Sequence, residues 1–336
     1  MNSNKRDLVS DVFRNKVPER TPVGFWFHFV EGDDVFNGLD NPEVVRKNID
    51  GHLRYYDAFK PDLVKLMSDG FFKYPDPLLS SDSSISSLER IAPLEGSHPW
   101  IQGQVRLVKE LVGRFGSEIM VFYNIFSPAT MLRILFGDGE KGNRRLADFI
   151  LENPSAVRRA LDAVGESLAL LSRLVIEEGG ADGVYVSVQS VQDGRIADSV
   201  YREVIAPSDK AVLAAANRAG GQNILHVCGY QGGRNNLTLF ADYESAAVNW
   251  AVNVEKISLK EGKKLFGGRA VIGGFANGSD GLLYRGSEKE IRDFTRALLA
   301  ESGSSGVALG ADCSLPSDID VQRLSWVRDE ASLIRN

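Results

Sequence analysis

The chain has 336 residues, of which 43% are hydrophobic and 25% are charged, values that suit a folded domain with a large buried core. With 39 Lys and Arg residues against 45 Asp and Glu residues, its formal net charge of −6 argues against the basic surface that nucleic acids and anionic membranes attract. Two cysteines exclude a disulfide framework, and no apolar run is long enough to cross a bilayer, so we expect a cytoplasmic protein without nucleic-acid or membrane partners.

Eight segments along the chain have the composition of β-strands. Each is short and rich in β-branched or aromatic residues, and turn residues follow most of them. In chain order they are residues 22–29, 62–67, 118–125, 183–189, 223–229, 245–254, 269–275 and 306–313, of which the sixth is the least clear.

Capping signals predict helices between these strands. Asn41 and Asn153 each precede a proline, the combination of an N-cap and a first helical residue. Ser208 is expected to cap a third helix, and Ser287 with Glu290 forms a capping box before a fourth. After Asn153, apolar residues recur at spacings of four and three, which predicts one long amphipathic helix. They are Val157, Leu161, Val164, Leu168, Leu171 and Val175.

Alternating strands and helices without a break in composition predict one α/β domain over residues 1–336, a (β/α)8 TIM barrel. A doubly wound sheet is less favoured because no Gly-x-Gly-x-x-Gly follows an early strand. We expect a helical extension at about residues 1–20 and a Ser- and Asp-rich excursion at about 75–100. In such a barrel the active site lies at the carboxyl ends of the strands.

The strongest candidate site combines His226, Cys228 and Cys313. Residues two apart on a strand project from the same side, and Cys313 ends the eighth predicted strand. One imidazole and two thiolates are a known zinc ligand set with the fourth position open to water or substrate. The alternative is that both cysteines are ordinary buried residues. Candidates for a fourth protein ligand are Asp312, Gln189 and Asp69.

Other polar residues stand at the ends of predicted strands. Asp69 ends the second strand, where it could bind a cationic or N–H group or move a proton, or simply cap the following turn. His28 ends the first strand as a candidate catalytic residue or as a hydrogen-bonded part of the wall. The expected substrate-binding residues near the ends of the third and fourth strands are Tyr123, Asn124, Ser187 and Gln189.

Several short segments, taken in order, resemble a known superfamily. They are residues 17–23 (Val-Pro-Glu-Arg-Thr-Pro-Val), 68–69, 226–229 (His-Val-Cys-Gly), 272–275 (Ile-Gly-Gly-Phe) and 310–316 (Gly-Ala-Asp-Cys-Ser-Leu-Pro). Their order and spacing resemble the uroporphyrinogen decarboxylase superfamily, which also holds zinc-dependent methyltransferases that act with corrinoids and thiols. This resemblance implies a (β/α)8 barrel of the uroporphyrinogen decarboxylase and methionine synthase type.

The resemblance is greater to the methyltransferase branch. There a His-x-Cys pair and a distant cysteine bind zinc, and His226, Cys228 and Cys313 match them, although relatives usually have glycine where this chain has Asp312. The porphyrin decarboxylases use an aspartate that Asp69 matches, but their arginine-rich segment is replaced by residues 24–29, which contain no arginine. A substrate with many carboxylates needs cationic partners, so this difference disfavours decarboxylation of uroporphyrinogen itself.

The resemblance therefore implies an enzyme that transfers a methyl group from a corrinoid or a methylated small molecule to a thiol bound at zinc. A thiol bound to zinc would lose its proton because the metal favours the anion. Zinc with two thiolates and one neutral imidazole has no net charge, so the bound thiolate would stay electron-rich. The alternative is a decarboxylase of a uroporphyrinogen-like or other carboxylated substrate that uses Asp69. Implied cofactors are zinc and a corrinoid donor, and implied partners are a small thiol or methylated substrate, a corrinoid protein and a second copy in a homodimer.

Overall fold

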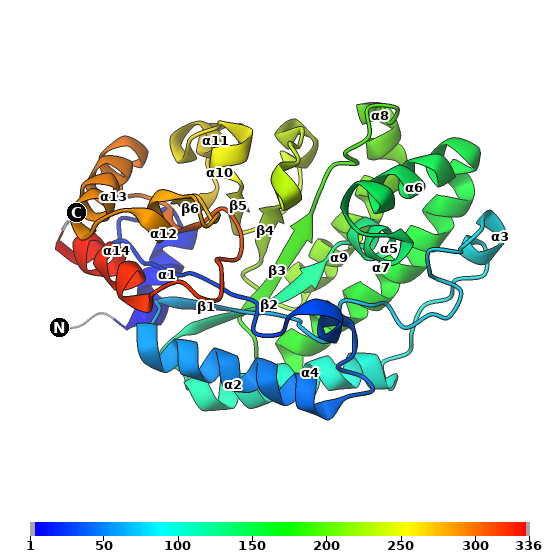
Figure 1. The fold of residues 1–336 in the computed structure, drawn as a ribbon, viewed down its shortest axis with the longest axis horizontal. Helices are drawn as coiled ribbons and strands as arrows, with labels where there is room; N and C mark the ends of the chain where they lie inside the picture. The colour runs from blue at the N-terminus through cyan, green and yellow to red at the C-terminus, as the bar shows by residue number, and fades with distance from the viewer. Residues whose placement is uncertain (1–3, 334–336) are drawn as a thin grey trace.

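Seven parallel strands form one curled sheet in residues 4–333, the part of the chain that this computed structural model describes (Figure 1). The strands follow one another around the sheet in sequence order, as the barrel prediction requires. They are β1 (Leu63–Leu66), β2 (Met120–Phe126), β3 (Gly183–Val188), β4 (Ile224–Val227), β5 (Ala247–Trp250), β6 (Ala270–Phe275) and β7 (Val307–Ala311).

The first predicted strand, residues 22–29, is irregular and closes the barrel between β7 and β1. Val23 and Phe27 each form an isolated parallel bridge, to Leu309 and Leu315, and the Val23 carbonyl accepts a hydrogen bond from Asp62 N at 2.9 Å. A regular ladder does not form because side chains replace backbone partners. The Asp62 carboxylate accepts from Val23 N at 2.9 Å, and the Tyr55 hydroxyl donates to the carbonyl of residue 25 at 2.7 Å.

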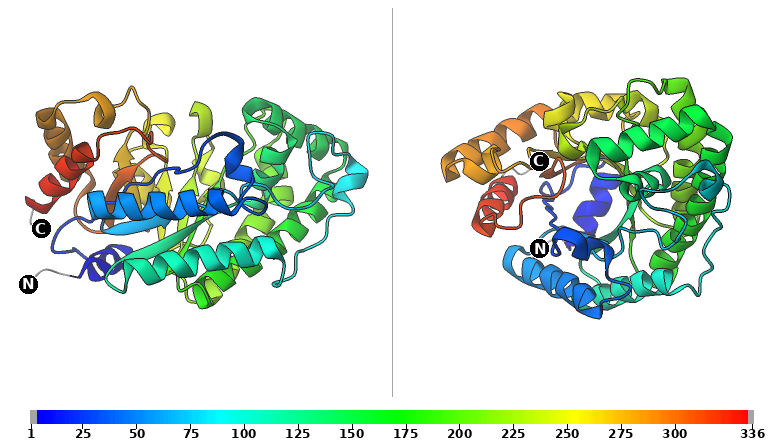
Figure 2. Two further views of the ribbon diagram at one scale, coloured as in Figure 1. Left: turned by 60° about the horizontal axis from the view of Figure 1, so that its bottom comes forward. Right: turned by 45° about the vertical axis from the view of Figure 1, so that its right-hand side comes forward.

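Helices surround the sheet, as the views in Figures 1 and 2 show. In the described residues none of them is long and apolar enough to span a bilayer. They are α1 (Lys5–Phe13), α2 (Pro42–Phe59), α3 (Ile85–Leu88), α4 (Pro99–Phe115), α5 (Pro128–Phe136), α6 (Gly139–Glu152), α7 (Pro154–Glu177), α8 (Asp198–Val200), α9 (Ala206–Arg218), α10 (Val252–Glu255), α11 (Leu259–Leu265), α12 (Leu282–Arg285), α13 (Glu288–Ser302) and α14 (Val321–Leu333).

The short helix α1 closes the barrel at the amino ends of the strands. Val9, Val12 and Phe13 of α1 pack into the barrel interior, and the rings of Phe13 and Phe122 lie 5.7 Å apart. The expected extension at about residues 1–20 thus contains α1, and its residues 1–3 lie outside the described part of the chain. Because the amino end is plugged, the interior can open only at the carboxyl ends of the strands.

The capping predictions agree with the structure at three of four positions. Asn41 and Asn153 accept from backbone N–H groups of α2 and α7, and Ser287 forms the capping box of α13. The prediction at Ser208 is wrong. A π-helical turn at Tyr201–Ile205 already precedes α9, so Ser208 lies inside the helix and its hydroxyl donates to the Ile205 carbonyl at 2.9 Å.

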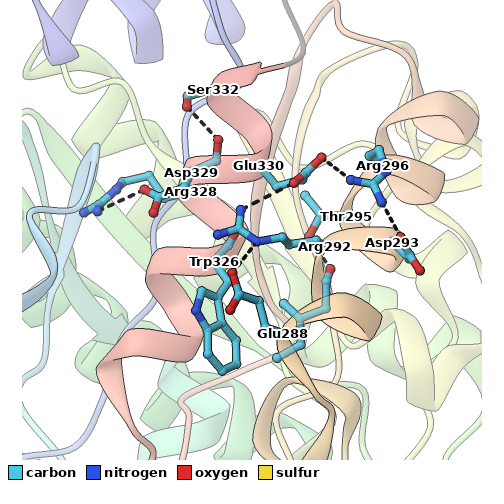
Figure 3. A network of polar contacts seen from close by, with 11 residues as sticks. Glu288, Arg292, Asp293, Thr295, Arg296, Trp326, Arg328, Asp329, Glu330 and Ser332 are labelled. Carbon is cyan, nitrogen blue, oxygen red and sulfur yellow. Dashed lines mark hydrogen bonds and ion pairs between the residues drawn. The ribbon is translucent and has the colours of Figure 1, made fainter.

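The last helix, α14, is held against α13 by ion pairs around a buried carboxylate (Figure 3). Glu330 on α14 accepts from Arg292 at 3.4 Å and from Arg296 at 2.5 Å, both on α13. Helix α14 also contacts α2. It therefore bridges α13, which precedes β7 in the chain, and α2, which precedes β1.

A buried carboxyl on α9, that of Asp209, makes the stability of the fold depend on pH. The Tyr201 and Tyr243 hydroxyls donate to one oxygen of Asp209 at 3.1 and 3.0 Å, and burial raises the pKa of this carboxyl to about 7. Because its folded-state pKa lies above the unfolded value, its contribution to stability is complete below about pH 4 and is lost as pH rises toward 7.

We expect Asp209→Asn to remove this loss. Between pH 5 and pH 8 the free energy of unfolding of the wild type should fall by roughly 2–3 kcal/mol more than that of the variant. Urea unfolding at the two pH values measures the difference, with Asp280→Asn, at an exposed site, as the control. Equal pH dependence in the wild type and Asp209→Asn would contradict the assignment.

Candidate metal centre

Three potential metal ligands from two strand ends converge at the carboxyl end of the barrel. His226 projects inward from β4, Cys228 follows β4, and Cys313 follows β7. The two sulfur atoms lie 3.9 Å apart, and one ligand atom from each of the three residues lies within 4.8 Å of the others. Two thiolates on a tetrahedral zinc ion would be about 3.8 Å apart. The three side chains therefore fit zinc.

The orientation of His226 is fixed by Asn249 on β5. Both hydrogen atoms of the Asn249 amide are engaged, because its Nδ2 donates to the carbonyls of Ile272 and Ala311 at 2.8 and 3.1 Å. Its Oδ1 can only accept, so the His226 Nδ1 that lies 2.5 Å away carries the proton. The other ring nitrogen, Nε2, is buried without a hydrogen-bond partner. A neutral histidine with the proton on Nδ1 and a free lone pair on Nε2 is a form that can bind a metal.

Asn249→Ala should lower zinc affinity by roughly 10- to 100-fold, because His226 would lose the partner that fixes its ring and tautomer. Competition with a chromophoric chelator measures this change. Tyr185→Phe is the matched control, since the Tyr185 hydroxyl donates to the same amide oxygen at 2.6 Å but binds no metal. A folded Asn249→Ala variant with unchanged zinc affinity would show that Asn249 does not orient the ligand.

The two thiols are coupled. A hydrogen bond from the Cys228 thiol lowers the pKa of Cys313, and the charge of Lys65 also favours its thiolate. The same sulfur–sulfur contact and burial raise the pKa of Cys228. The contact thus favours a proton on Cys228 over one on Cys313, and a divalent cation bound to both sulfurs would displace it.

A cavity of about 730 Å³ opens beside these three residues. Of the residues expected to contact substrate, His28, Asn124, Ser187 and Gln189 line it. Tyr123 lies elsewhere, because alternate residues of β2 face opposite sides and Tyr123 points outward, where its hydroxyl donates to Gln104 on α4 at 2.8 Å.

Asp69 is buried behind the cavity wall and does not line the cavity. One of its oxygens lies 2.8 Å from His28 Nδ1, and the other accepts from Phe29 N at 2.7 Å and Val30 N at 3.3 Å. It therefore anchors the segment that brings His28 to the cavity. The Asp69 carboxylate therefore does not cap the turn that follows the second predicted strand, which was the alternative role for it.

The proposed fourth ligands lie in three different settings. Gln189 lines the cavity, and its amide donates to the Cys228 carbonyl at 3.2 Å. Asp312 accepts from Asn253 N at 2.8 Å with one oxygen, and its other oxygen is buried without a partner. The oxygens of Asp69 are engaged as described. Neither carboxylate, Asp312 nor Asp69, joins the cluster of His, Cys, Asp and Glu ligands found in the described residues.

Two buried cations that the sequence analysis did not select also line the cavity. Lys65 projects inward from β1, and burial lowers its pKa to about 8, against the opposing effect of Cys313 and Cys228. Arg133 on α5 has a buried Nε without a hydrogen-bond partner. The inward direction of Lys65 could have been deduced from strand alternation, whereas the position of Arg133 depends on how α5 packs. Together they make the cavity suitable for an anion.

Comparison with known proteins gives one family and one fold. Residues 4–332 match the family described as uroporphyrinogen decarboxylase (URO-D). No curated protein matches the sequence.

Solved structures that resemble this one include a methyltransferase from Methanosarcina mazei, with TM-score 0.68, 15% identity and 98% of each chain covered. A structure described as a vitamin-B12-independent methionine synthase from Listeria monocytogenes has TM-score 0.58 and 13% identity over 96% of this chain and 100% of the other. A B12-independent methionine synthase from Shewanella sp. W3-18-1 has TM-score 0.53 and 13% identity over 94% and 97%. At these identities the likeness shows the shared fold.

Proposed function

The chain belongs to the uroporphyrinogen decarboxylase family, and on that premise we propose that it is a zinc-dependent methyltransferase. It would move a methyl group from a corrinoid or a methylated small molecule to a thiol. The observation that carries the proposal is the unpartnered Nε2 of His226 facing the paired sulfurs of Cys228 and Cys313. The similarity to a methyltransferase and to a B12-independent methionine synthase supports methyl transfer.

The residues around the candidate metal centre have separate tasks. When bound, zinc would supply the Lewis acidity that keeps a thiol in its anionic, nucleophilic form. Asn249 holds the His226 ring so that Nε2 faces the two sulfurs. Phe72 and Phe126, whose ring centroids lie 4.7 Å apart, give the cavity an apolar wall that limits water around the reacting thiol.

The proposed partners follow from the same site. The cavity has room for a small thiol or a methylated small molecule, which would contact Asn124, Ser187 and Gln189 on its wall. A corrinoid protein as methyl donor and a homodimer of this chain complete the proposal.

A decarboxylase acting on a carboxylated substrate is the second candidate, and the buried cations Lys65 and Arg133 favour it. A desolvated carboxylate needs such partners. In that case His28, held by Asp69, is the group proposed to move the proton, since His28 lines the cavity and Asp69 does not.

Zinc analysis and activity assays on purified protein distinguish the methyltransferase from the decarboxylase. We expect about one zinc per chain, together with thiol-dependent loss of the methyl group from methylcobalamin when 2-mercaptoethanol is added. Protein that retains no zinc after expression with zinc present would count against the methyltransferase. Release of carbon dioxide from uroporphyrinogen without added thiol would favour the decarboxylase.

A further inference from the structure

Lys65 is a charged side chain in the interior of the barrel. It projects inward from β1, in register with Phe122 of β2, and it is 6% exposed. Its ammonium lies 4.0 Å from the centroid of the Tyr185 ring and 5.5 Å from that of Trp26. Within residues 4–333 its ammonium group makes no hydrogen bond and no ion pair with a protein group. A buried cation of this kind is expensive unless a nearby charge compensates it.

The charges that favour the ammonium point to the candidate metal centre. Cys313 has the largest favourable effect on Lys65, followed by Cys228 and then Asp69. Asp69 is already engaged by His28 and two backbone N–H groups. The aromatic faces add only modest stabilisation. Lys65 and the two sulfurs also line the same cavity.

Counting charges shows what the lysine adds. Two thiolates balance a divalent cation, and neutral His226 adds nothing, so the metal with its three protein ligands has no net charge. With Lys65 included, the site carries one positive charge. One further anion in the open position compensates Lys65, whereas a neutral ligand leaves the lysine uncompensated.

We propose that Lys65 determines the ligand specificity of the metal centre by favouring a singly charged anion, such as a thiolate, over a neutral ligand at the open position. This inference rests on the proposed function. An apolar side chain would fill the same space without the cost of burying a charge. The preference for an anion at the open position explains why a lysine occupies this place.

Lys65→Met tests the proposal because it keeps the length of the side chain and removes its charge. The wild type and the variant are loaded with Co²⁺ in place of zinc, and the cobalt–sulfur absorption bands are followed during titration with 2-mercaptoethanol. We expect the variant to bind this thiol roughly 10- to 100-fold more weakly than the wild type. Binding of neutral imidazole should change by less than about threefold. Lys289→Met, on the exposed face of α13, is the matched control and should behave as the wild type.

Each outcome of these titrations either supports or contradicts the proposed role of Lys65. Equal thiol affinity in the wild type and Lys65→Met, or equal losses for thiol and imidazole, would overturn the role of Lys65 and leave the metal centre intact. Wild-type protein without cobalt–sulfur bands would overturn the metal centre itself, and the inference with it. If Lys65→Met does not fold, Lys65→Gln offers a second neutral variant for the same titrations.

Discussion

Replacement of either Cys228 or Cys313 by serine is expected to abolish stoichiometric zinc binding while the barrel stays folded. A serine hydroxyl keeps its proton at neutral pH and is a poor zinc ligand, so each variant would retain only two strong protein ligands. Zinc content should fall from about one ion per chain to less than about 0.1 after dialysis against a weak chelator. Both cysteines line the cavity, so the expected cost to the free energy of unfolding of the apoprotein is only about 1 kcal/mol.

The matched control is Ser314→Ala. Ser314 follows Cys313 and lines the same cavity, and its hydroxyl is buried without a partner. This variant should keep its zinc. Elemental analysis must be done with a reductant present, because sulfurs 3.9 Å apart can approach to form a disulfide and release metal for an unrelated reason. Retention of zinc in both cysteine variants would rule out the proposed ligand set.

The barrel and the three candidate ligands could be predicted because they depend on local patterns. Seven of the predicted strand segments overlap observed strands, since β-branched composition and turn residues act over short distances. The pairing of His226 with Cys228 follows from alternation along one strand. Cys313 could be added because the strands of a barrel end around one opening.

What the sequence could not supply is the environment of these ligands. Asn249 is one polar residue in the least clear of the predicted strands, and its role depends on the register that places it beside His226. The first predicted strand, residues 22–29, is irregular because side chains of Asp62 and Tyr55 take over backbone partners in it. No pattern within residues 22–29 reveals contacts with side chains so distant in sequence.

The environment also changes the chemistry inferred from the ligands alone. Two thiolates and zinc suggest a neutral site, whereas Lys65 beside them makes the site positive, and Arg133 adds a second cation to the cavity. A neutral site would leave a thiolate electron-rich but would not attract it. A positive site favours its binding, at some cost to its nucleophilicity.

The second large effect is expected for Asp69→Asn, which should lower the free energy of unfolding by about 2–4 kcal/mol. The carboxylate accepts from His28 Nδ1 and from the backbone N–H groups of Phe29 and Val30 in a buried position. An asparagine has one acceptor oxygen and no charge, so the two backbone N–H groups lose a charged acceptor and His28 must change tautomer to accept from the new NH₂ group. Urea unfolding measures the loss, and His28→Ala is the control, since it removes one donor and leaves both backbone hydrogen bonds.

This pair of variants distinguishes an anchor from a catalytic carboxylate. If Asp69 acts by holding residues 28–30, Asp69→Asn should lose stability and activity together, whereas His28→Ala should cost at most about 1 kcal/mol. If His28 moves a proton during decarboxylation, His28→Ala should abolish carbon dioxide release at nearly unchanged stability. An Asp69→Asn variant as stable as the wild type but inactive would contradict the anchor, because only direct participation of the carboxylate in the reaction explains that result.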